Sequence, residues 1–113
     1  MAKYESYLRG NFDEILGAIN QGILRGSVSA SFEDGSDFTG PGVGMRCAVR
    51  VYERYSMLGQ NRVSLNVTLF SFGERIRLSA ITSGGSQAVL FKINTLGEQS
   101  FLDRLIDIVK RYQ

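Results

Sequence analysis

Hydrophobic and polar residues alternate along the second half of the chain, and this alternation predicts an antiparallel sheet. Strands are expected at residues 45–54, 62–71 and 76–83, with a shorter one at 88–93. Each has hydrophobic side chains at every second position: Met45, Cys47, Val49 and Val51; then Val63, Leu65, Val67 and Leu69; then Ile76, Leu78 and Ala80; then Val89, Phe91 and Ile93. The pattern is typical of antiparallel strands with one buried face. It predicts that Cys47 points into the core.

Two segments have helical periodicity instead. The first has hydrophobic residues Phe12, Ile15, Leu16, Ile19 and Ile23, with Asn11 as the expected N-cap and Gly26 as the expected C-terminal cap. The second follows Thr95 and Glu98, whose spacing forms a capping box. Its hydrophobic stripe consists of Phe101, Leu102, Leu105, Ile106, Val109 and Tyr112. We expect this stripe to pack on the buried face of the sheet.

Shorter segments complete the order of elements. Residues 3–9 and 28–32 are expected to be strands, and residues 33–44 a loop rich in glycine and aspartate. The order is then strand, helix, five strands, helix. It predicts a single α+β domain over residues 1–113, in which a curved antiparallel sheet packs on the C-terminal helix. The TATA-binding-protein-like and helix-grip folds share this topology.

The amino-acid composition limits the catalytic and metal-binding sites that the chain can form. The chain has no histidine and one cysteine, so it lacks the usual general base near neutral pH and cannot form ordinary zinc sites. A single cysteine allows no internal disulfide, which favours the cytoplasm over secretion. No segment approaches the roughly 20 apolar residues of a membrane span. We expect a cytoplasmic protein that is not an enzyme, with no metal, no cofactor and no membrane contact.

Charge is concentrated in the middle of the chain. Residues 45–77 contain six arginines and two glutamates, although the whole chain has a net charge of only +2. Pairing apolar faces with one another predicts a hairpin register that places Arg46 beside Phe70 and Phe70 beside Arg77 on the outer face of the sheet. That face is the candidate contact surface, and its members are Arg46, Arg50, Tyr52, Phe70, Arg77, Ile81 and Leu90.

Three segments resemble a known family. They are residues 47–55 (CAVRVYERY), residues 61–68 (NRVSLNVT) and the chain from Gly84 onward. Over its full length the sequence resembles a family of small bacterial proteins classed only as a domain of unknown function. The resemblance implies a stand-alone bacterial domain, and it brings no activity, cofactor or site residue.

Three functions remain open from the sequence. The favoured one is a non-enzymatic interaction module that forms a homodimer, or binds a protein partner, through its sheet. The alternative is a small-ligand binder with a pocket between the sheet and the C-terminal helix. Nucleic-acid binding on the arginine-rich face is the least favoured, because a pI of 8.9 is weak for such a protein. A plain solvated sheet face also accounts for the pattern.

Overall fold

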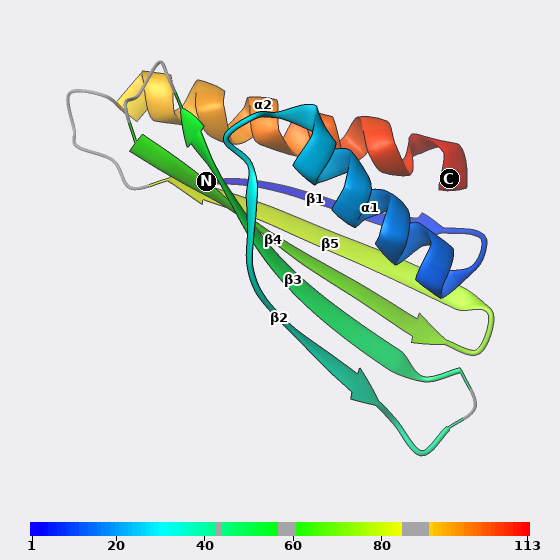
Figure 1. Cartoon of the computed structure of the whole chain (residues 1–113). Helices are drawn as coiled ribbons and strands as arrows, with labels where there is room; N and C mark the ends of the chain where they lie inside the picture. The colour runs from blue at the N-terminus through cyan, green and yellow to red at the C-terminus, as the bar shows by residue number, and fades with distance from the viewer. Residues whose placement is uncertain (43, 57–60, 85–90) are drawn as a thin grey trace.

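The computed structural model describes residues 1–42, 44–56, 61–84 and 91–113. Its elements are β1 (Ala2–Leu8), α1 (Phe12–Gly26), β2 (Ser31–Thr39), β3 (Arg46–Ser56), β4 (Asn61–Phe72), β5 (Arg75–Gly84), α2 (Phe91–Val109) and a final 3-10 turn (Lys110–Tyr112). The strands form one antiparallel sheet in the order β1-β5-β4-β3-β2. Both helices cover the same face of this twisted sheet (Figure 1). The predicted α+β class is confirmed.

The core lies between the helices and the sheet. The expected inner residues of α2, namely Phe101, Leu105 and Val109, are buried in one cluster with Leu65, Val67 and Leu78 of the sheet. Ile15, Ile19 and Ile23 of α1 are buried in the same cluster. The helical periodicity therefore identified the buried faces of both helices correctly.

Helix α1 begins at the expected cap. The side chain of Asn11 accepts a hydrogen bond from the backbone N–H of Glu14, 2.9 Å away. This bond satisfies one of the N–H groups that a helix start leaves free. Gly26 is the last helical residue, and Ser27 follows it in an extended conformation.

Two of the predicted boundaries are wrong. Residues 33–39, expected as a loop, belong to the edge strand β2, whereas the expected strand at 28–32 contributes only its last two residues. The polar composition of β2 is typical of an edge strand, which must avoid pairing with other chains. Gly35 is required there because a Cβ would lie 2.8 Å from the carbonyl oxygen of Val49. The side chain of Arg50 also passes close to Gly35.

The predicted strand at 88–93 is also wrong where the structure describes it. Phe91 and Ile93 belong to α2, so Thr95 and Glu98 lie inside the helix rather than at its start. Strand β5 has no free edge for another strand, because it pairs with β4 on one side and with β1 on the other. The described order is strand, helix, four strands, helix.

The register of the sheet explains why the outward and inward residues of β3 differ from the prediction. Strands β4 and β5 pair as predicted, with Leu69 opposite Leu78. Strands β3 and β4 pair one residue away from the prediction, so Arg46 lies opposite Ser71 rather than Phe70. A shift of one residue exchanges the two faces of a strand. Cys47, expected in the core, therefore lies half-buried on the outer face.

Candidate interaction surface

Within the described residues, both helices lie on one face of the sheet and the other face has no helix over it (Figure 1). At one end of this uncovered face, one side chain from each of the five strands forms a row. In the order β2, β3, β4, β5, β1 the row is Phe38, Cys47, Phe70, Arg77 and Tyr7. We call it the aromatic row.

The aromatic row is accessible. Phe38 is 61% exposed, Tyr7 60% and Phe70 41%. The guanidinium carbon of Arg77 lies 5.1 Å from the ring centroid of Tyr7, and Arg77 donates a hydrogen bond to the Tyr7 hydroxyl at 3.1 Å. Arg77 thus lies between two exposed aromatic residues of the row, Tyr7 and Phe70. Arginine and aromatic residues are enriched in protein interfaces.

The rest of the uncovered face is mixed. The next row along the strands consists of Ser36, Val49, Thr68, Ser79 and Glu5, and the one after it of Asp34, Val51, Asn66, Ile81 and Lys3. In these two rows β3 contributes Val49 and Val51, whereas β5 contributes only Ile81, and the charged side chains lie on the two edge strands. The hydrophobic side chains outside the aromatic row are separated by polar ones, since Thr68 and Ser79 follow Val49, and Asn66 lies between Val51 and Ile81.

The structure divides the seven candidate residues between the two faces. Phe70, Arg77 and Ile81 lie on the uncovered face, as expected. The other described candidates, Arg46, Arg50 and Tyr52, lie on the face covered by helices. Leu90 lies outside the described residues, as do the other first residues of the strand expected at 88–93.

Beneath the helices the arginines of β3 are well accommodated. Arg46 lies over the ring of Phe12 and Arg54 over that of Phe101, with 4.3 and 4.6 Å to the ring centroids. Arg50 pairs with Asp37 at 3.0 Å. Long arginine stems cover apolar surface while their charged ends stay partnered, so these side chains replace aliphatic residues on the inner face. Burial lowers the pKa of Arg54.

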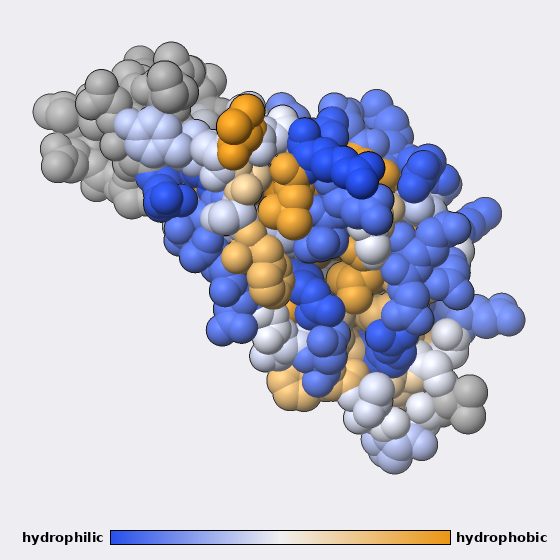
Figure 2. All heavy atoms as spheres, viewed as in Figure 1, coloured by the Kyte–Doolittle hydropathy of each residue, from blue (hydrophilic) through white to orange (hydrophobic). Residues whose placement is uncertain are grey.

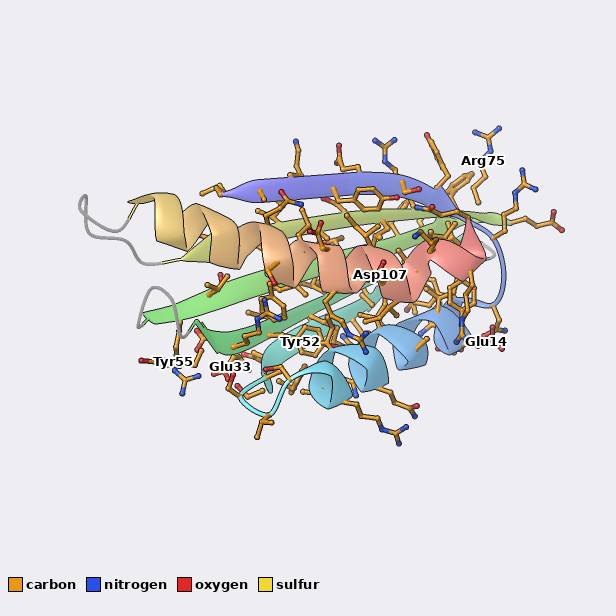
Figure 3. The ribbon with its side chains drawn as sticks, turned by 90° about the horizontal axis from the view of Figure 1, so that it is seen from above. Glu14, Glu33, Tyr52, Tyr55, Arg75 and Asp107 are labelled. Carbon is orange, nitrogen blue, oxygen red and sulfur yellow. The ribbon has the colours of Figure 1, made fainter. Side chains whose placement is uncertain are left out.

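Tyr52 is the most deeply buried polar side chain of β3. It is fully buried, and its hydroxyl donates a hydrogen bond of 2.9 Å to the side-chain oxygen of Asn20 in α1. Seen from above, it lies beneath the space between the two helices (Figure 3). Burial raises the pKa of Tyr52 to about 12, and the charge of Arg50 opposes this shift. Tyr52 is therefore a structural residue with no exposed reactive group.

Sequence reasoning missed three members of the aromatic row: Tyr7, Phe38 and Cys47. Tyr4 and Tyr7 are three residues apart, so they lie on opposite faces of their strand, and the sequence pattern does not show which of them is on the outer face. Phe38 carried no strand signal because its segment has the composition of a loop. Cys47 was assigned to the core because it alternates with valines.

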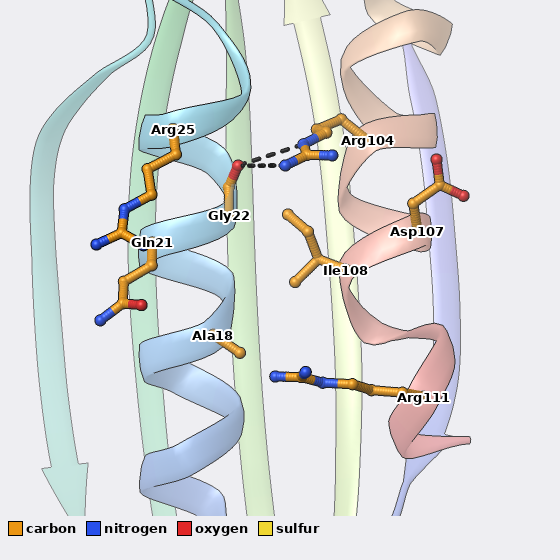
Figure 4. A pocket seen from close by; sticks show the side chains of 8 residues that line it. All are labelled: Ala18, Gln21, Gly22, Arg25, Arg104, Asp107, Ile108 and Arg111. Atoms are coloured by element: carbon orange, nitrogen blue, oxygen red, sulfur yellow. Dashed lines mark hydrogen bonds between the residues drawn. The ribbon is translucent and has the colours of Figure 1, made fainter.

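A basic groove of about 390 Å³ lies between the two helices. Arg104 of α2 crosses it and donates hydrogen bonds of 3.2 and 3.1 Å from Nε and one terminal nitrogen to the carbonyl oxygen of Gly22 (Figure 4). That carbonyl belongs to the last turns of α1. Arg25 and Arg111 also line the groove. The contact of Arg104 joins the two helices.

A second groove of about 550 Å³ lies between α1 and the edge strand β2. Its apolar lining consists of Leu16, Leu24 and Phe32, and Asp13 and Arg50 supply charge. Figure 2 shows hydrophobic side chains between charged ones on this side of the molecule. Neither groove is the pocket that was expected between the sheet and the C-terminal helix. The inner side chains of α2 are buried against the sheet.

One acidic side chain is buried. Glu98 is 5% exposed, and its carboxylate contacts the amino group of Met1. It does not line any of the grooves described above. Within the described residues no group of histidine, cysteine or acidic side chains could hold a metal ion. No helix in the same part of the chain is long and apolar enough to cross a membrane.

Comparison with known proteins places the chain in a family. Residues 1–113 match the family described as Family of unknown function (DUF6054). The chain belongs to this family. Neither a curated protein nor a solved structure matched it. The DUF6054 description assigns no activity, so the uncovered face is the feature from which a function has to be argued.

Proposed function

We propose that this chain is a non-enzymatic interaction module that binds another protein chain through the uncovered face of its sheet. The observation that carries the proposal is the aromatic row. Three aromatic side chains, each at least two-fifths exposed, lie in one row across the full width of the sheet, with Cys47 and Arg77 between them. Covering them would remove a large apolar area from water.

The composition of the face supports a protein partner over a nucleic acid. Single-strand binders combine aromatic side chains with a groove of positive charge that follows the phosphates. Here the arginines of β3 point to the other side of the sheet, and Asp34 and Glu5 lie on the uncovered face. The nucleic-acid alternative loses Arg46 and Arg50 and keeps Arg77 of the arginines on which it depended.

A non-enzymatic, cytoplasmic role fits the side chains at hand. The sequence contains no histidine, and the buried carboxylate of Glu98 faces an amino group rather than a groove. The single cysteine, Cys47, lies half-buried in the aromatic row. A single cysteine allows no internal disulfide, and this is consistent with a reducing compartment such as the cytoplasm.

The test compares phenylalanines on the two faces of the sheet: Phe38 and Phe70 on the uncovered face, and Phe32, in the same strand as Phe38, on the helix side. Phe38→Ser together with Phe70→Ser removes two rings from the uncovered face, whereas Phe32→Ser removes one of similar exposure from the helix side. Self-association is measured by sedimentation equilibrium. Proteins that the purified chain captures from an extract of its native cells are identified. Their dissociation constants are then measured with purified protein. Circular dichroism verifies the fold of each variant.

We expect the double variant to bind at least tenfold more weakly and Phe32→Ser to bind like wild type. Truncating exposed aromatic anchors has effects of this size in protein interfaces. The proposal is overturned if wild type neither associates with itself nor binds another protein in a manner that depends on Phe38 and Phe70.

The groove between α1 and β2 supports a second candidate function, the binding of a small apolar ligand. Leu16, Leu24 and Phe32 supply the apolar lining, and Gly17 leaves open space beside them. Native mass spectrometry of the purified protein reports any bound small molecule. A ligand that is lost in Leu24→Asp, and kept in Phe38→Ser, would favour this candidate over the first.

A further inference from the structure

We infer that the partner of the uncovered face is a second copy of this chain, related by a two-fold axis that runs along β4. The inference rests on the proposed function and specifies its partner. It comes from the arrangement of side chains across the sheet. Closed two-fold dimers are the commonest homo-oligomers, and their interfaces must be complementary to themselves.

The position of β4 sets the geometry. It is the central strand, with β5 and β1 on one side and β3 and β2 on the other. A two-fold axis lying between two facing sheets and parallel to β4 places β3 over β5 of the second copy, and β2 over β1. The side chains of β4 then lie opposite the same side chains of β4 in the second copy. Sheets packed face to face keep their strands within about 30° of one another, as this arrangement requires.

Under this axis the apolar side chains face each other. Phe38 lies opposite Tyr7 of the second copy, Phe70 opposite its own counterpart, and Val51 opposite Ile81. The aromatic row is thereby buried against itself. Every exposed ring of the row gains an aromatic partner, and aromatic pairs contribute beyond the area they bury.

The charges of the face are complementary under the same axis. Lys3 lies opposite Asp34 of the second copy, and symmetry gives each dimer two such pairs. Within the described part of the chain neither residue forms an ion pair in the single copy. Glu5 lies opposite Ser36 and Arg77 opposite Cys47, so these charges do not meet like charges.

A two-fold axis across the strands gives a poorer match. It would place each strand over its own counterpart with the row order reversed. If it passed through the centre of the face, Phe38 would lie opposite Ser31 and Phe70 opposite Ser64. Such an arrangement leaves the aromatic rings against hydroxyl groups, so the apolar row selects the axis along β4.

The area of the face is large enough for a dimer. Five strands at about 4.8 Å spacing, with about seven residues of 3.3 Å each, give roughly 550 Å² of sheet. Two such faces cover roughly 1,100 Å², which is above the size of most crystal contacts and at the low end of specific interfaces. The expected dimer is therefore of modest affinity and dissociates on dilution.

Cysteine cross-linking tests the axis directly, in a Cys47→Ser background. Thr68 lies on the axis in β4, so Thr68→Cys should form a disulfide with its own counterpart. Glu5→Cys combined with Ser36→Cys should also cross-link, because the two positions face each other across the interface. Ser36→Cys alone is the matched control and should stay uncross-linked, since its counterpart lies about four strand spacings away, roughly 19 Å.

Charge reversal provides a second, independent readout. Lys3→Asp alone and Asp34→Lys alone should each raise the dimer dissociation constant about tenfold, because each alters both copies of the pair. The two substitutions together should restore it to within about threefold of wild type. Both positions are exposed on edge strands, and circular dichroism confirms that each variant folds.

Each outcome bears on the inference. A dimer that cross-links through positions 5 and 36 and recovers on double charge reversal supports it. A dimer that persists in Phe38→Ser/Phe70→Ser, or that fails to cross-link through positions 5 and 36, overturns it. A monomeric wild type overturns it as well. In that case the proposed function still stands if another protein binds in a manner that depends on Phe70.

Discussion

The guanidinium carbon of Arg46 lies 4.3 Å from the ring centroid of Phe12, and a terminal nitrogen of the same group lies 2.9 Å from a carboxylate oxygen of Asp13. One side chain of β3 thus contacts the first turn of α1 through both its flat face and its charge. Arg54 repeats the stacking contact on Phe101 of α2. The arginines of β3 therefore help to fix both helices on the sheet.

Arg46→Ala should lower the free energy of unfolding by about 1–2 kcal/mol. It removes a stacking contact worth about 0.5–1 kcal/mol, a partly exposed ion pair and the packing of the stem. Arg75→Ala is the matched control, because Arg75 is exposed at the end of β5, and its effect should stay within about 0.5 kcal/mol. Urea denaturation measures both. Equal losses in the two variants would contradict the stacking role.

The sequence predicted the structure correctly where a single local signal, such as a helix cap or a hydrophobic stripe, allowed few alternatives. Asn11 and Ile15 were assigned correctly, because a cap and a helical stripe leave few alternatives. Leu69 and Leu78 fixed the register of β4 and β5 because both strands have one strictly hydrophobic face. These signals are local, or involve two neighbouring strands only.

The sequence failed where the inner face contains arginine. Val49 and Val51 were expected to be buried in β3, and Arg46 and Arg50 to be exposed. However, α1 supplies a stacking and a charged partner for Arg46, and Asp37 of β2 pairs with Arg50, which no strand pattern reveals. Phe91 was read as a strand because a short apolar run does not distinguish strand from helix. For the candidate surface, the residues from β4 and β5 were identified and those from β3 were placed on the wrong face.

Leu105→Ala should lower the free energy of unfolding by about 2–5 kcal/mol. Leu105 is fully buried in the cluster that joins α2 to the sheet, and truncation leaves a cavity there. Ile106 of the same helix is only partly buried, so Ile106→Ala should cost less. Denaturant unfolding with a constant m value checks both. A loss below about 1 kcal/mol for Leu105→Ala would show that the site does not form part of the core.

Two glycines of α1 should respond in opposite directions to alanine. A Cβ on Gly22 would lie 2.5 Å from Cδ1 of Ile108 in α2, whereas one on Gly17 would meet nothing within 4 Å. Gly17→Ala should stabilise the protein by about 1 kcal/mol through helix propensity. Gly22→Ala should destabilise it, because the helices must move apart or Ile108 must shift.

The double variant Gly22→Ala/Ile108→Ala separates the clash from the effect of propensity. Removing most of the Ile108 side chain should make Gly22→Ala less destabilising than it is with Ile108 present. Thermal unfolding of the four proteins gives the coupling free energy between the two positions. A coupling near zero would mean that the close approach of α1 and α2 at Gly22 does not constrain the helices.

Tyr52 should make stability fall at high pH. Its pKa is raised to about 12 by burial, above the value of about 10 for an unfolded chain. The folded protein therefore retains this proton at a pH where the unfolded chain has lost it. Stability from this group is complete below pH 10 and declines, by about 1 kcal/mol per pH unit, as the pH rises toward 12.

Tyr52→Phe is the variant that isolates this effect. It loses the hydrogen bond to Asn20, so it should be less stable than wild type by about 1 kcal/mol at pH 8. The difference should shrink and then reverse as the pH is raised above 10, because the variant has no phenol to titrate at this position. Urea denaturation at successive pH values measures the difference. The absorbance change on phenolate formation, taken as wild type minus variant, should have its midpoint near pH 12. A midpoint near pH 10, with a stability difference that does not vary with pH, would show that the hydroxyl of Tyr52 is open to water.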